Sequence, residues 1–155
     1  MTTNTTKTYD VAVIGGGVIG TSCVYHLVKK GFSVALIEKN NVARGTSSHC
    51  DAAALLVDKQ PGADAALGYG SIQRFLELQQ ELSYDFELHQ RGCVYVCDTE
   101  REFEVAAQYA KDMQADGYNV NALSPKELLE HEPYLAKDLA GGLFSDVDCG
   151  LNPFK

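Results

Sequence analysis

The feature that most constrains the fold is a glycine-rich turn between two apolar segments. Gly15-Gly16-Gly17-Val18-Ile19-Gly20 satisfies the pattern Gly-x-Gly-x-x-Gly. An apolar run at 9–14 predicts a buried strand before the turn, and apolar residues at helical spacing over 18–30 predict a helix after it. A second apolar run at 32–37 completes a βαβ unit in about 30 residues. This order of elements is typical of a dinucleotide-binding fold.

Three glycines and one acid have distinct predicted roles at this turn. Gly15 permits the tight turn, Gly17 lets a pyrophosphate approach the backbone, and Gly20 lets the helix pack closely on the strand. Glu38 follows the second predicted strand, where a carboxylate can accept hydrogen bonds from both ribose hydroxyls of an adenosine. The same acid disfavours a 2′-phosphate, so NADP is the least favoured dinucleotide. The motif leaves NAD and FAD open, and the alternative is a glycine-rich turn in an unrelated α/β protein.

Beyond residue 38 the sequence predicts a long connection followed by alternating helices and strands. Residues 40–63 form the connection, with a Pro61-Gly62 turn signal, and loops of this length are often functional. Ser124-Pro125-Lys126-Glu127 predicts a capped helix start. The other expected elements are helices at 67–86 and 100–116, strands at 92–97, 120–123 and 140–145, and a turn-like segment at 146–155.

Composition limits the class of protein. The 155 residues, of which 45% are hydrophobic, fit one domain with a core. The net charge of −8 has the wrong sign for binding nucleic acid or an anionic membrane. No apolar run approaches the ~20 residues of a membrane span, and the polar residues 1–8 lack the apolar stretch of a signal peptide. We therefore expect a cytoplasmic protein with no membrane span.

The five cysteines predict no disulfide framework, because they are odd in number and spread along the chain. Cys93 and Cys97 lie on one predicted strand at an even offset, so they share a face and a dithiol is conceivable. No second pair of Cys or His stands at metal-ligand spacing. Buried thiols are therefore preferred over a zinc or redox pair, and no metal site is predicted.

Ordered motifs beyond Glu38 narrow the choice of cofactor. They are Arg44-Gly45-Thr46-Ser47-Ser48-His49, Leu123-Ser124-Pro125-Lys126-Glu127-Leu128, Glu132-Pro133-Tyr134-Leu135, Gly141-Gly142-Leu143-Phe144 and Asp148-Cys149-Gly150-Leu151-Asn152-Pro153. With the glycine motif, this set resembles the FAD-dependent D-amino-acid oxidase and glycine/sarcosine oxidase family. The resemblance runs from Tyr9 to the last residue, and the later motifs are more specific than the first.

The resemblance implies an α/β fold in pieces. A Rossmann-like FAD-binding βαβ unit is followed by the first part of an α+β substrate domain, and another chain completes the fold. The implied pieces are the N-terminal part of the FAD-binding domain at 1–60, its helical connection at 61–90, and the first part of the substrate domain at 91–155.

The resemblance also implies FAD as the cofactor and a set of contacts with it. In that family the loop matching residues 45–48 lies along the FAD, and its hydroxyl groups donate to the pyrophosphate or ribityl chain. A merely polar surface loop is the alternative. Many members have Gly-Gly beside the isoalloxazine, where this chain has Asp51-Ala52-Ala53. The implied cofactor-binding residues are Gly15, Gly17, Val18, Ile19, Gly20, Glu38, Lys39, Arg44, Gly45, Thr46, Ser47, Ser48, His49 and Ala52.

His49 has three interpretations. Some relatives that oxidise dimethylglycine or sarcosine have a His at about this point that is bonded covalently to the flavin. A contact with the flavin without a bond is preferred over that link. A solvent-exposed loop His is the third interpretation.

The reaction implied by the resemblance is oxidation of a C–N bond in a D-amino acid, glycine, sarcosine or a proline-like amine. Family members bind the substrate carboxylate with Arg and Tyr residues mainly beyond this segment, so no catalytic residue is assigned. Tyr95, Tyr109 and Tyr118 are candidates for a pocket wall, with core packing the preferred role for each.

The resemblance finally implies a partner. In that family the flavin domain is assembled from separated pieces of a much longer chain. We therefore expect a complementary C-terminal chain or subunit, and an enzyme that is inactive without it. A non-catalytic FAD- or NAD-binding electron-transfer subunit is the alternative function. A disulfide reductase fragment is disfavoured, because no close pair of cysteines follows the first βαβ unit.

Overall fold

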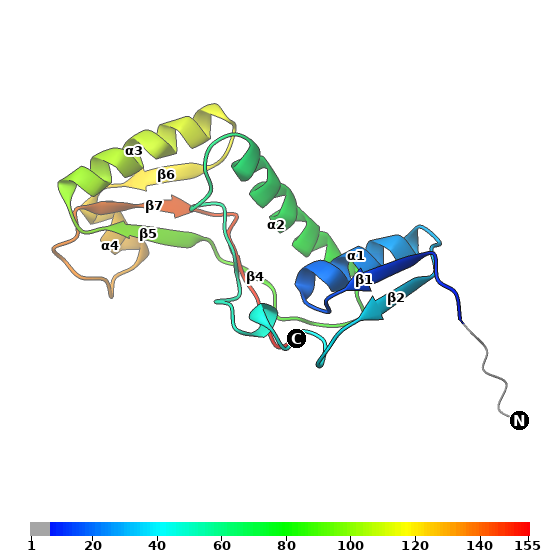
Figure 1. Cartoon of the computed structure of the whole chain (residues 1–155). Coiled ribbons are helices and arrows are strands. Elements are labelled where there is room, and N and C mark those ends of the chain that lie inside the picture. The colour runs from blue at the N-terminus through cyan, green and yellow to red at the C-terminus, as the bar shows by residue number, and fades with distance from the viewer. Residues whose placement is uncertain (1–6) are drawn as a thin grey trace, which may run out of the picture. The chain divides into compact units, whose positions relative to one another are not determined.

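A computed structural model describes residues 7–155 and divides them into two compact units (Figure 1). The first unit extends to Asp51 and includes Phe154, and the second comprises Ala52–Pro153 and Lys155. The predicted absence of a signal peptide depends partly on residues 1–6, which lie outside the described residues. The functional division at residues 60 and 90 stays a prediction.

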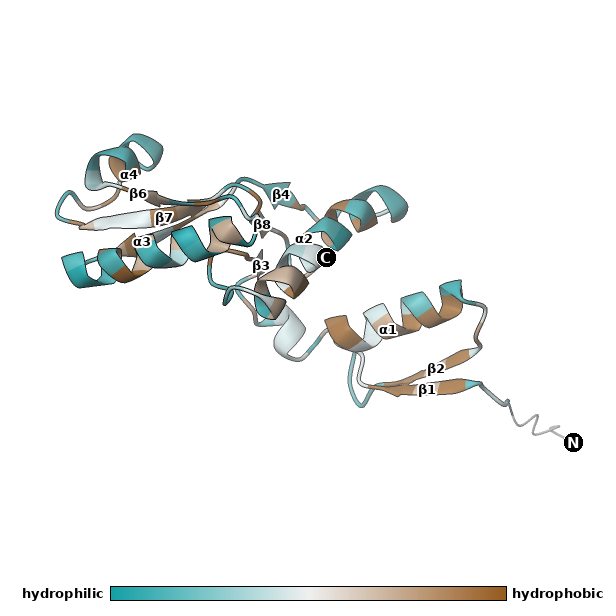
Figure 2. Cartoon of the chain, turned by 90° about the horizontal axis from the view of Figure 1, so that it is seen from above, coloured by the Kyte–Doolittle hydropathy of each residue, from teal (hydrophilic) through white to brown (hydrophobic). Residues whose placement is uncertain are grey.

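The first unit is the predicted βαβ motif. Strands β1 (Val11–Ile14) and β2 (Val34–Ile37) are parallel, with Val11 opposite Val34 at one end of the register. Helix α1 (Val18–Lys29) connects them and packs on both. Figure 2 shows that both strands are apolar along their length. The order of elements predicted from the glycine motif is confirmed.

The strands of this unit are less buried than their sequence predicts. An apolar run was expected to be covered on both faces, yet Ile14 is 85% exposed and Ile37 is 53% exposed. Helix α1 has no fully buried residue, and Ile19 in its first turn is 80% exposed. The reason is that β1 and β2 form a sheet of only two strands. Among the described residues, this unit contributes no side chain to the buried hydrophobic core.

The second unit contains a three-stranded antiparallel sheet in the order β5-β7-β6. Its strands are β5 (Cys93–Cys97), β6 (Val120–Leu123) and β7 (Gly141–Ser145), and its covering helices are α3 (Glu100–Ala115) and α4 (Pro125–His131).

The two helices cover opposite faces of this sheet. A Cβ atom at Gly141 would meet Phe103 of α3, whereas one at Gly142 would meet Leu128 of α4. Because consecutive strand residues point to opposite faces, the contacts place the helices on either side of β7. Glycine at both positions therefore lets the two helices approach the central strand.

Both helices begin with a capping box. Ser124 accepts from the backbone N–H of Glu127 while Glu127 accepts from Ser124, as the sequence predicts. Thr99 and Glu102 make the same pair of bonds at the start of α3. The Thr-x-x-Glu spacing was present in the sequence, so this second cap was predictable.

A smaller antiparallel sheet joins distant segments of the second unit. It has the order β3-β8-β4, with β3 (Ala53–Ala54), β4 (His89–Gln90) and β8 (Cys149–Gly150). Helix α2 (Ala63–Glu81) precedes β4. The buried hydrophobic core belongs to this unit and consists of Leu56, Val57, Ala65, Ile72, Phe86, Leu88, Cys97, Ala106, Ala110, Met113, Val120, Leu143 and Cys149.

Several predicted boundaries need correction. The helix expected at 67–86 runs from Ala63 to Glu81, because the chain turns at Gly62 and becomes extended at Leu82. The connection at 40–63 contains a 3-10 turn at Thr46–Ser48 and strand β3, and the turn-like segment at 146–155 contains β8. These short strands are formed by pairing between distant residues, which sequence periodicity does not reveal.

Three further observations apply to the described residues 7–155. None of their helices has the length and apolar character needed to cross a membrane. None of their His, Cys, Asp and Glu residues gather in a group able to hold a metal ion. All five cysteines are free thiols, with Cys97 and Cys149 buried. Burial raises the pKa of these two thiols, as expected for residues of a core.

Candidate functional site

The turn between β1 and α1 is built around two glycines. Gly15 has a φ angle of 103°, in the left-handed region that glycine adopts without strain, and its N–H donates to the Ile37 carbonyl at 2.8 Å. A Cβ atom at Gly20 would lie 1.8 Å from the Gly15 carbonyl oxygen. The first turn of α1 therefore approaches the glycine loop too closely for any side chain at residue 20.

Glu38 binds the same turn through its carboxylate. One oxygen accepts from the Gly16 N–H at 2.7 Å, and the other accepts from the Asn40 N–H at 2.9 Å. These two bonds lower the pKa of Glu38, and the bond from Gly16 has the larger effect. The group is therefore ionised at neutral pH. Gly16 and Asn40 were not among the predicted site residues, because backbone donors leave no signature in residue type.

The loop after β2 closes on the N-terminus of α1. The Ser47 Oγ accepts from the Val18 N–H at 2.9 Å, and the Ala43 N–H donates to the Gly16 carbonyl at 2.8 Å. The Val18 N–H is one of the helix donors that lack a partner within the helix. Because its oxygen is the acceptor in this bond, the Ser47 hydroxyl retains a proton that it can donate.

His49 is fixed by its own loop. Its Nδ1 lies 2.9 Å from the Gly45 carbonyl oxygen and 3.1 Å from the Ser48 Oγ. A carbonyl only accepts, so we assign the proton to Nδ1. The Ser48 hydroxyl also donates to Gly45. The ring is exposed, and its Nε2 is the nitrogen left for another contact.

The structure brings most of the predicted cofactor residues together in the first unit. The glycine turn, the start of α1, Glu38 and Ser47 are joined by the bonds above, and the exposed side chains of Lys39, Arg44 and Thr46 belong to the same connection. Ala52 differs, because it begins the second compact unit. Its φ angle of 59° is left-handed, a conformation in which glycine is the unstrained residue.

The N-terminus of α1 is suited electrostatically to an anion. Its first turn contains no acidic residue, and the positive end of the helix dipole lies there. Gly16 is buried while Val18 and Ile19 are exposed, so a buried backbone segment lies next to solvent-exposed residues at this turn. The arrangement of glycine backbone, helix N-terminus and a donor hydroxyl fits a pyrophosphate, and Glu38 fits a ribose beside it.

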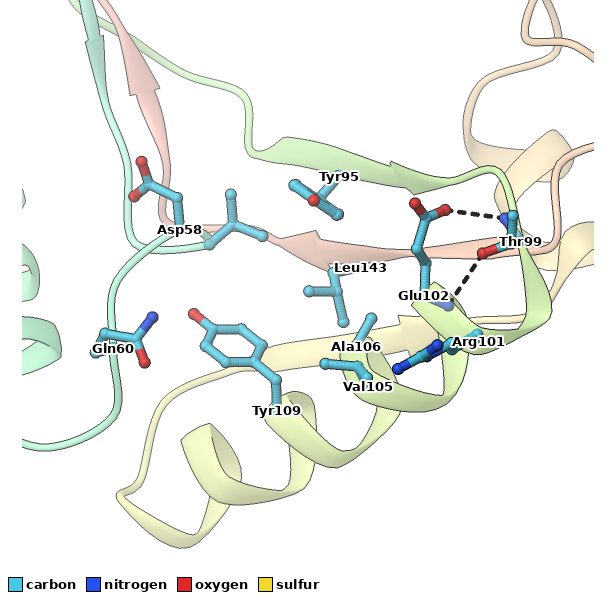
Figure 3. A pocket seen from close by; sticks show the side chains of 11 residues that line it. Asp58, Gln60, Tyr95, Thr99, Arg101, Glu102, Val105, Ala106, Tyr109 and Leu143 are labelled. Carbon is cyan, nitrogen blue, oxygen red and sulfur yellow. Dashed lines mark hydrogen bonds between the residues drawn. The ribbon is translucent and has the colours of Figure 1, made fainter.

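A separate pocket of about 610 Å³ lies in the second unit (Figure 3). Tyr95 and Leu143 form part of the sheet floor, while Tyr109 and Glu102 extend from α3. Tyr109 donates to the Lys59 carbonyl at 2.8 Å, and burial raises its pKa to about 12. Tyr118 instead packs against Tyr69, with ring centroids 5.6 Å apart. Two of the three predicted tyrosines thus line a pocket.

Comparison with known proteins identifies the family. The family profile described as "DAO: FAD dependent oxidoreductase" matches residues 10–155. The chain belongs to this family. The predicted resemblance and the α/β fold class are therefore confirmed, and the family's cofactor is FAD.

Individual DAO-family proteins are similar to this chain at moderate identity. A glycine oxidase of Geobacillus kaustophilus (strain HTA426) is 33% identical over 153 residues, covering 92% of this chain and 40% of the relative. The dimethylglycine dehydrogenase of Rattus norvegicus is 27% identical over 151 residues, covering 94% of this chain and 17% of the relative. The chain thus spans less than half the length of either relative.

Solved structures of oxidases have the same fold over nearly the whole chain. The crystal structure of glycine oxidase from Geobacillus kaustophilus matches with a TM-score of 0.85 and 28% identity, covering 94% of this chain and 41% of that one. The L-alpha-glycerophosphate oxidase from Mycoplasma pneumoniae, solved with FAD bound, matches with a TM-score of 0.80 and 26% identity. This match covers 96% of this chain and 40% of the oxidase chain.

Proposed function

We propose that the first unit binds the ADP part of FAD in an amine or amino-acid oxidoreductase. The observation that carries the proposal is the bonded set of Gly16, Val18, Glu38 and Ser47 around the start of α1. The N-terminus of α1 and the Ser47 hydroxyl would hold the pyrophosphate, and Glu38 would accept from the adenosine ribose. Lys39 and Arg44 would add positive charge near the phosphates.

The proposed substrates are small amines: a D-amino acid, glycine, sarcosine, dimethylglycine or a proline-like amine. When bound, FAD supplies the acceptor for a hydride equivalent from the carbon next to nitrogen. The residues of this chain would orient that cofactor, while no residue here is assigned to bind the substrate. Glycine oxidase and dimethylglycine dehydrogenase support the class, since both are named for oxidation at such a carbon.

Anaerobic reduction of the flavin tests this function. The protein, with any polypeptide that accompanies it, is mixed with each amine in turn and with glycerol 3-phosphate as the non-amine comparison. We expect at least one amine to remove the visible absorbance of oxidised flavin. If dithionite reduces the flavin but no amine does, the electron-transfer subunit becomes the better proposal. If glycerol 3-phosphate reduced the flavin and no amine did, the proposed reaction would be oxidation at a C–O bond instead of a C–N bond.

Glu38→Gln is expected to weaken FAD binding roughly tenfold, because the amide nitrogen of Gln would face a backbone N–H that needs an acceptor. Titration of the flavin-free protein, together with the polypeptide that accompanies it, with FAD measures the change. Glu104→Gln on the exposed surface of α3 is the matched control and should leave the affinity unaltered.

The pH dependence of binding follows from the lowered pKa of Glu38. A carboxyl whose pKa is depressed in the folded protein contributes while it is ionised, and the contribution is lost as pH falls through that depressed value. Affinity for FAD should therefore be flat around neutral pH and fall only in acid below the usual glutamate range. An affinity that already falls between pH 7 and 6 would point to a different group.

We further propose that His49 contacts the flavin without a covalent bond. Precipitating the protein in acid should then leave the yellow flavin in the supernatant. Colour that remains with the precipitated polypeptide would show a covalent link instead. His49→Ala would then abolish that retained colour if His49 is the attachment point.

We also propose that further polypeptide, in a separate chain or in additional sequence, covers the first unit. The exposed side chains of Ile14, Ile19 and Ile37 support this, because a two-stranded sheet with one helix buries too little apolar surface to be stable alone. The proposed enzyme would be inactive without that polypeptide.

A further inference from the structure

The two edges of the three-stranded sheet differ in how their backbone is covered. The order β5-β7-β6 makes β6 one edge and β5 the other. At the β6 edge, the Gln114 side chain of α3 donates to the Val120 carbonyl at 2.9 Å. At β5, within residues 7–155, the only side chain bonded to the backbone is Cys93 of the same strand, whose thiol donates to the Val94 carbonyl at 3.7 Å. Another element therefore covers the backbone at β6 but not at β5.

The backbone of β5 alternates between the sheet and its open edge. A Cβ atom at Gly142 of β7 would lie 2.5 Å from the Tyr95 carbonyl oxygen, so this carbonyl points toward β7. In an antiparallel pair, successive residues direct their N–H and C=O groups alternately toward the partner strand and away from it. The backbone groups of Val94 and Val96 consequently point to the open edge, where a further strand can pair with them.

Side chains of β5 are exposed on both faces of the sheet. Tyr95 lies opposite Leu143 on the face that α3 covers in part, and it is 53% exposed. Val96 lies opposite Gly142 on the α4 face and is 41% exposed. A helix packed on one face would cover only one of these side chains. An added strand would flank both faces and also pair with the backbone, so it accounts for all of the exposed groups.

The pocket of about 610 Å³ lies on the α3 side of this edge (Figure 3). Tyr95 and Val57 belong to its lining, and so does Val105 of α3, which is 67% exposed. Asp148 accepts from the N–H groups of Leu56 at 2.6 Å and Val57 at 3.3 Å, so this part of the wall is fixed. Preformed pockets beside an edge strand receive the alternate side chains of a strand that is added there.

We propose that a β-strand of the further polypeptide pairs with β5 as the next strand of this sheet. The inference rests on the proposed function, in which further polypeptide covers the first unit, and it names a surface of the second unit where that polypeptide binds. Large apolar side chains of the added strand would fill the pocket. Acidic side chains are disfavoured there, because Asp58 and Glu102 line it. In the glycine oxidase of Geobacillus kaustophilus, more than half of the chain lies outside the matched part, which is ample length for such a strand.

Amide hydrogen exchange of the complete protein, with its accompanying polypeptide, tests the pairing. The Ala122 amide is the internal comparison, because it also points away from β7, as the Val120 carbonyl does two residues earlier on β6. An N–H paired in a sheet exchanges only when the strand opens. The amides of Val94 and Val96 should therefore be protected roughly tenfold more, or better, than the amide of Ala122.

Two substitutions remove the pairing in different ways. Val96→Pro deletes an outward N–H without deleting a bond to β7, and Ala122→Pro is the matched control at the β6 edge. Val105→Lys places a charge in the pocket and leaves the β5 backbone unchanged. Gln108→Lys is its control, since Gln108 is exposed on α3 and lies outside the pocket lining. Val96→Pro and Val105→Lys should each reduce protection of the Val94 amide roughly tenfold, and the controls should leave it unaltered.

The Leu143 amide of the central strand reports whether the sheet itself remains folded. If Val96→Pro exposes that amide too, Val105→Lys decides the outcome. Protection at Val94 and Val96 no greater than at Ala122 would overturn the inference, as would protection that Val105→Lys leaves intact. Protection at β5 in a protein that no amine reduces and that binds no flavin would refute the proposed function and leave this strand pairing in place.

Discussion

Gly20→Ala is expected to abolish retention of FAD and to lower the free energy of unfolding by about 2–3 kcal/mol. The new methyl group would lie 1.8 Å from the Gly15 carbonyl oxygen, a backbone atom with no alternative rotamer. Relief requires α1 to move away from the glycine loop. That movement would also displace the Val18 N–H from Ser47, so the proposed pyrophosphate site would lose its shape.

Gly70→Ala is the matched control, because Gly70 also lies within a helix and a Cβ there would have no atom within 4 Å. It should leave flavin content unaltered and raise stability by about 0.5–1 kcal/mol, the usual preference for alanine in a helix. Flavin content per mole of protein and thermal unfolding, measured on the protein with its accompanying polypeptide, compare both variants with the wild type. Wild-type flavin content in Gly20→Ala would show that the close approach of α1 is unimportant for binding.

This chain, isolated from all other polypeptide, is expected to associate or aggregate and to retain no FAD. The first unit exposes Ile14 by 85% and Ile19 by 80% and adds nothing to the buried hydrophobic core among the described residues. Burying one such side chain is worth roughly 1.5–3 kcal/mol, so surfaces of this kind rarely stay in water. Size-exclusion chromatography with light scattering gives the mass, and a monomer that binds FAD would contradict the expectation.

Substituting the exposed apolar residues tests the cause of that association. Ile14→Ser with Ile19→Ser should raise the monomeric share and, in the complete flavoprotein, weaken binding of the covering polypeptide by at least tenfold. Tyr134→Ser is the control, since Tyr134 is fully exposed but belongs to the second unit. Equal effects of the two changes would mean that exposure anywhere, rather than this surface, drives association.

The sequence predicted those parts of the site that depend on residues close together along the chain. The glycine motif, the helix after it and the acid after the second strand lie within 30 consecutive residues, and the structure has the predicted βαβ order around them. The capping box at Ser124 was predictable for the same reason, since its two residues, Ser124 and Glu127, are close in the sequence. The family resemblance depends on motifs that are each contiguous in the sequence, and the family match over residues 10–155 agrees with it.

The remaining features depend on contacts that residue type does not encode. Glu38 was expected to bind a ribose, but its bonds to two backbone N–H groups became visible only in the structure. Asp148 and Leu56 are 92 residues apart, and nothing in either local sequence predicts their bond. The apolar composition of β1 predicted burial on both faces, whereas burial depends on which neighbours are present.

In the proposed site, the bond between Glu38 and Gly16 would couple recognition of the ribose to recognition of the pyrophosphate. One carboxylate both faces the expected sugar and shapes the loop expected to receive the phosphates. Drawing that carboxylate toward a ribose would therefore alter the geometry offered to the pyrophosphate. A cofactor analogue without ribose hydroxyls should leave that carboxylate on Gly16, so its change in affinity should differ from the value of the missing hydrogen bonds alone.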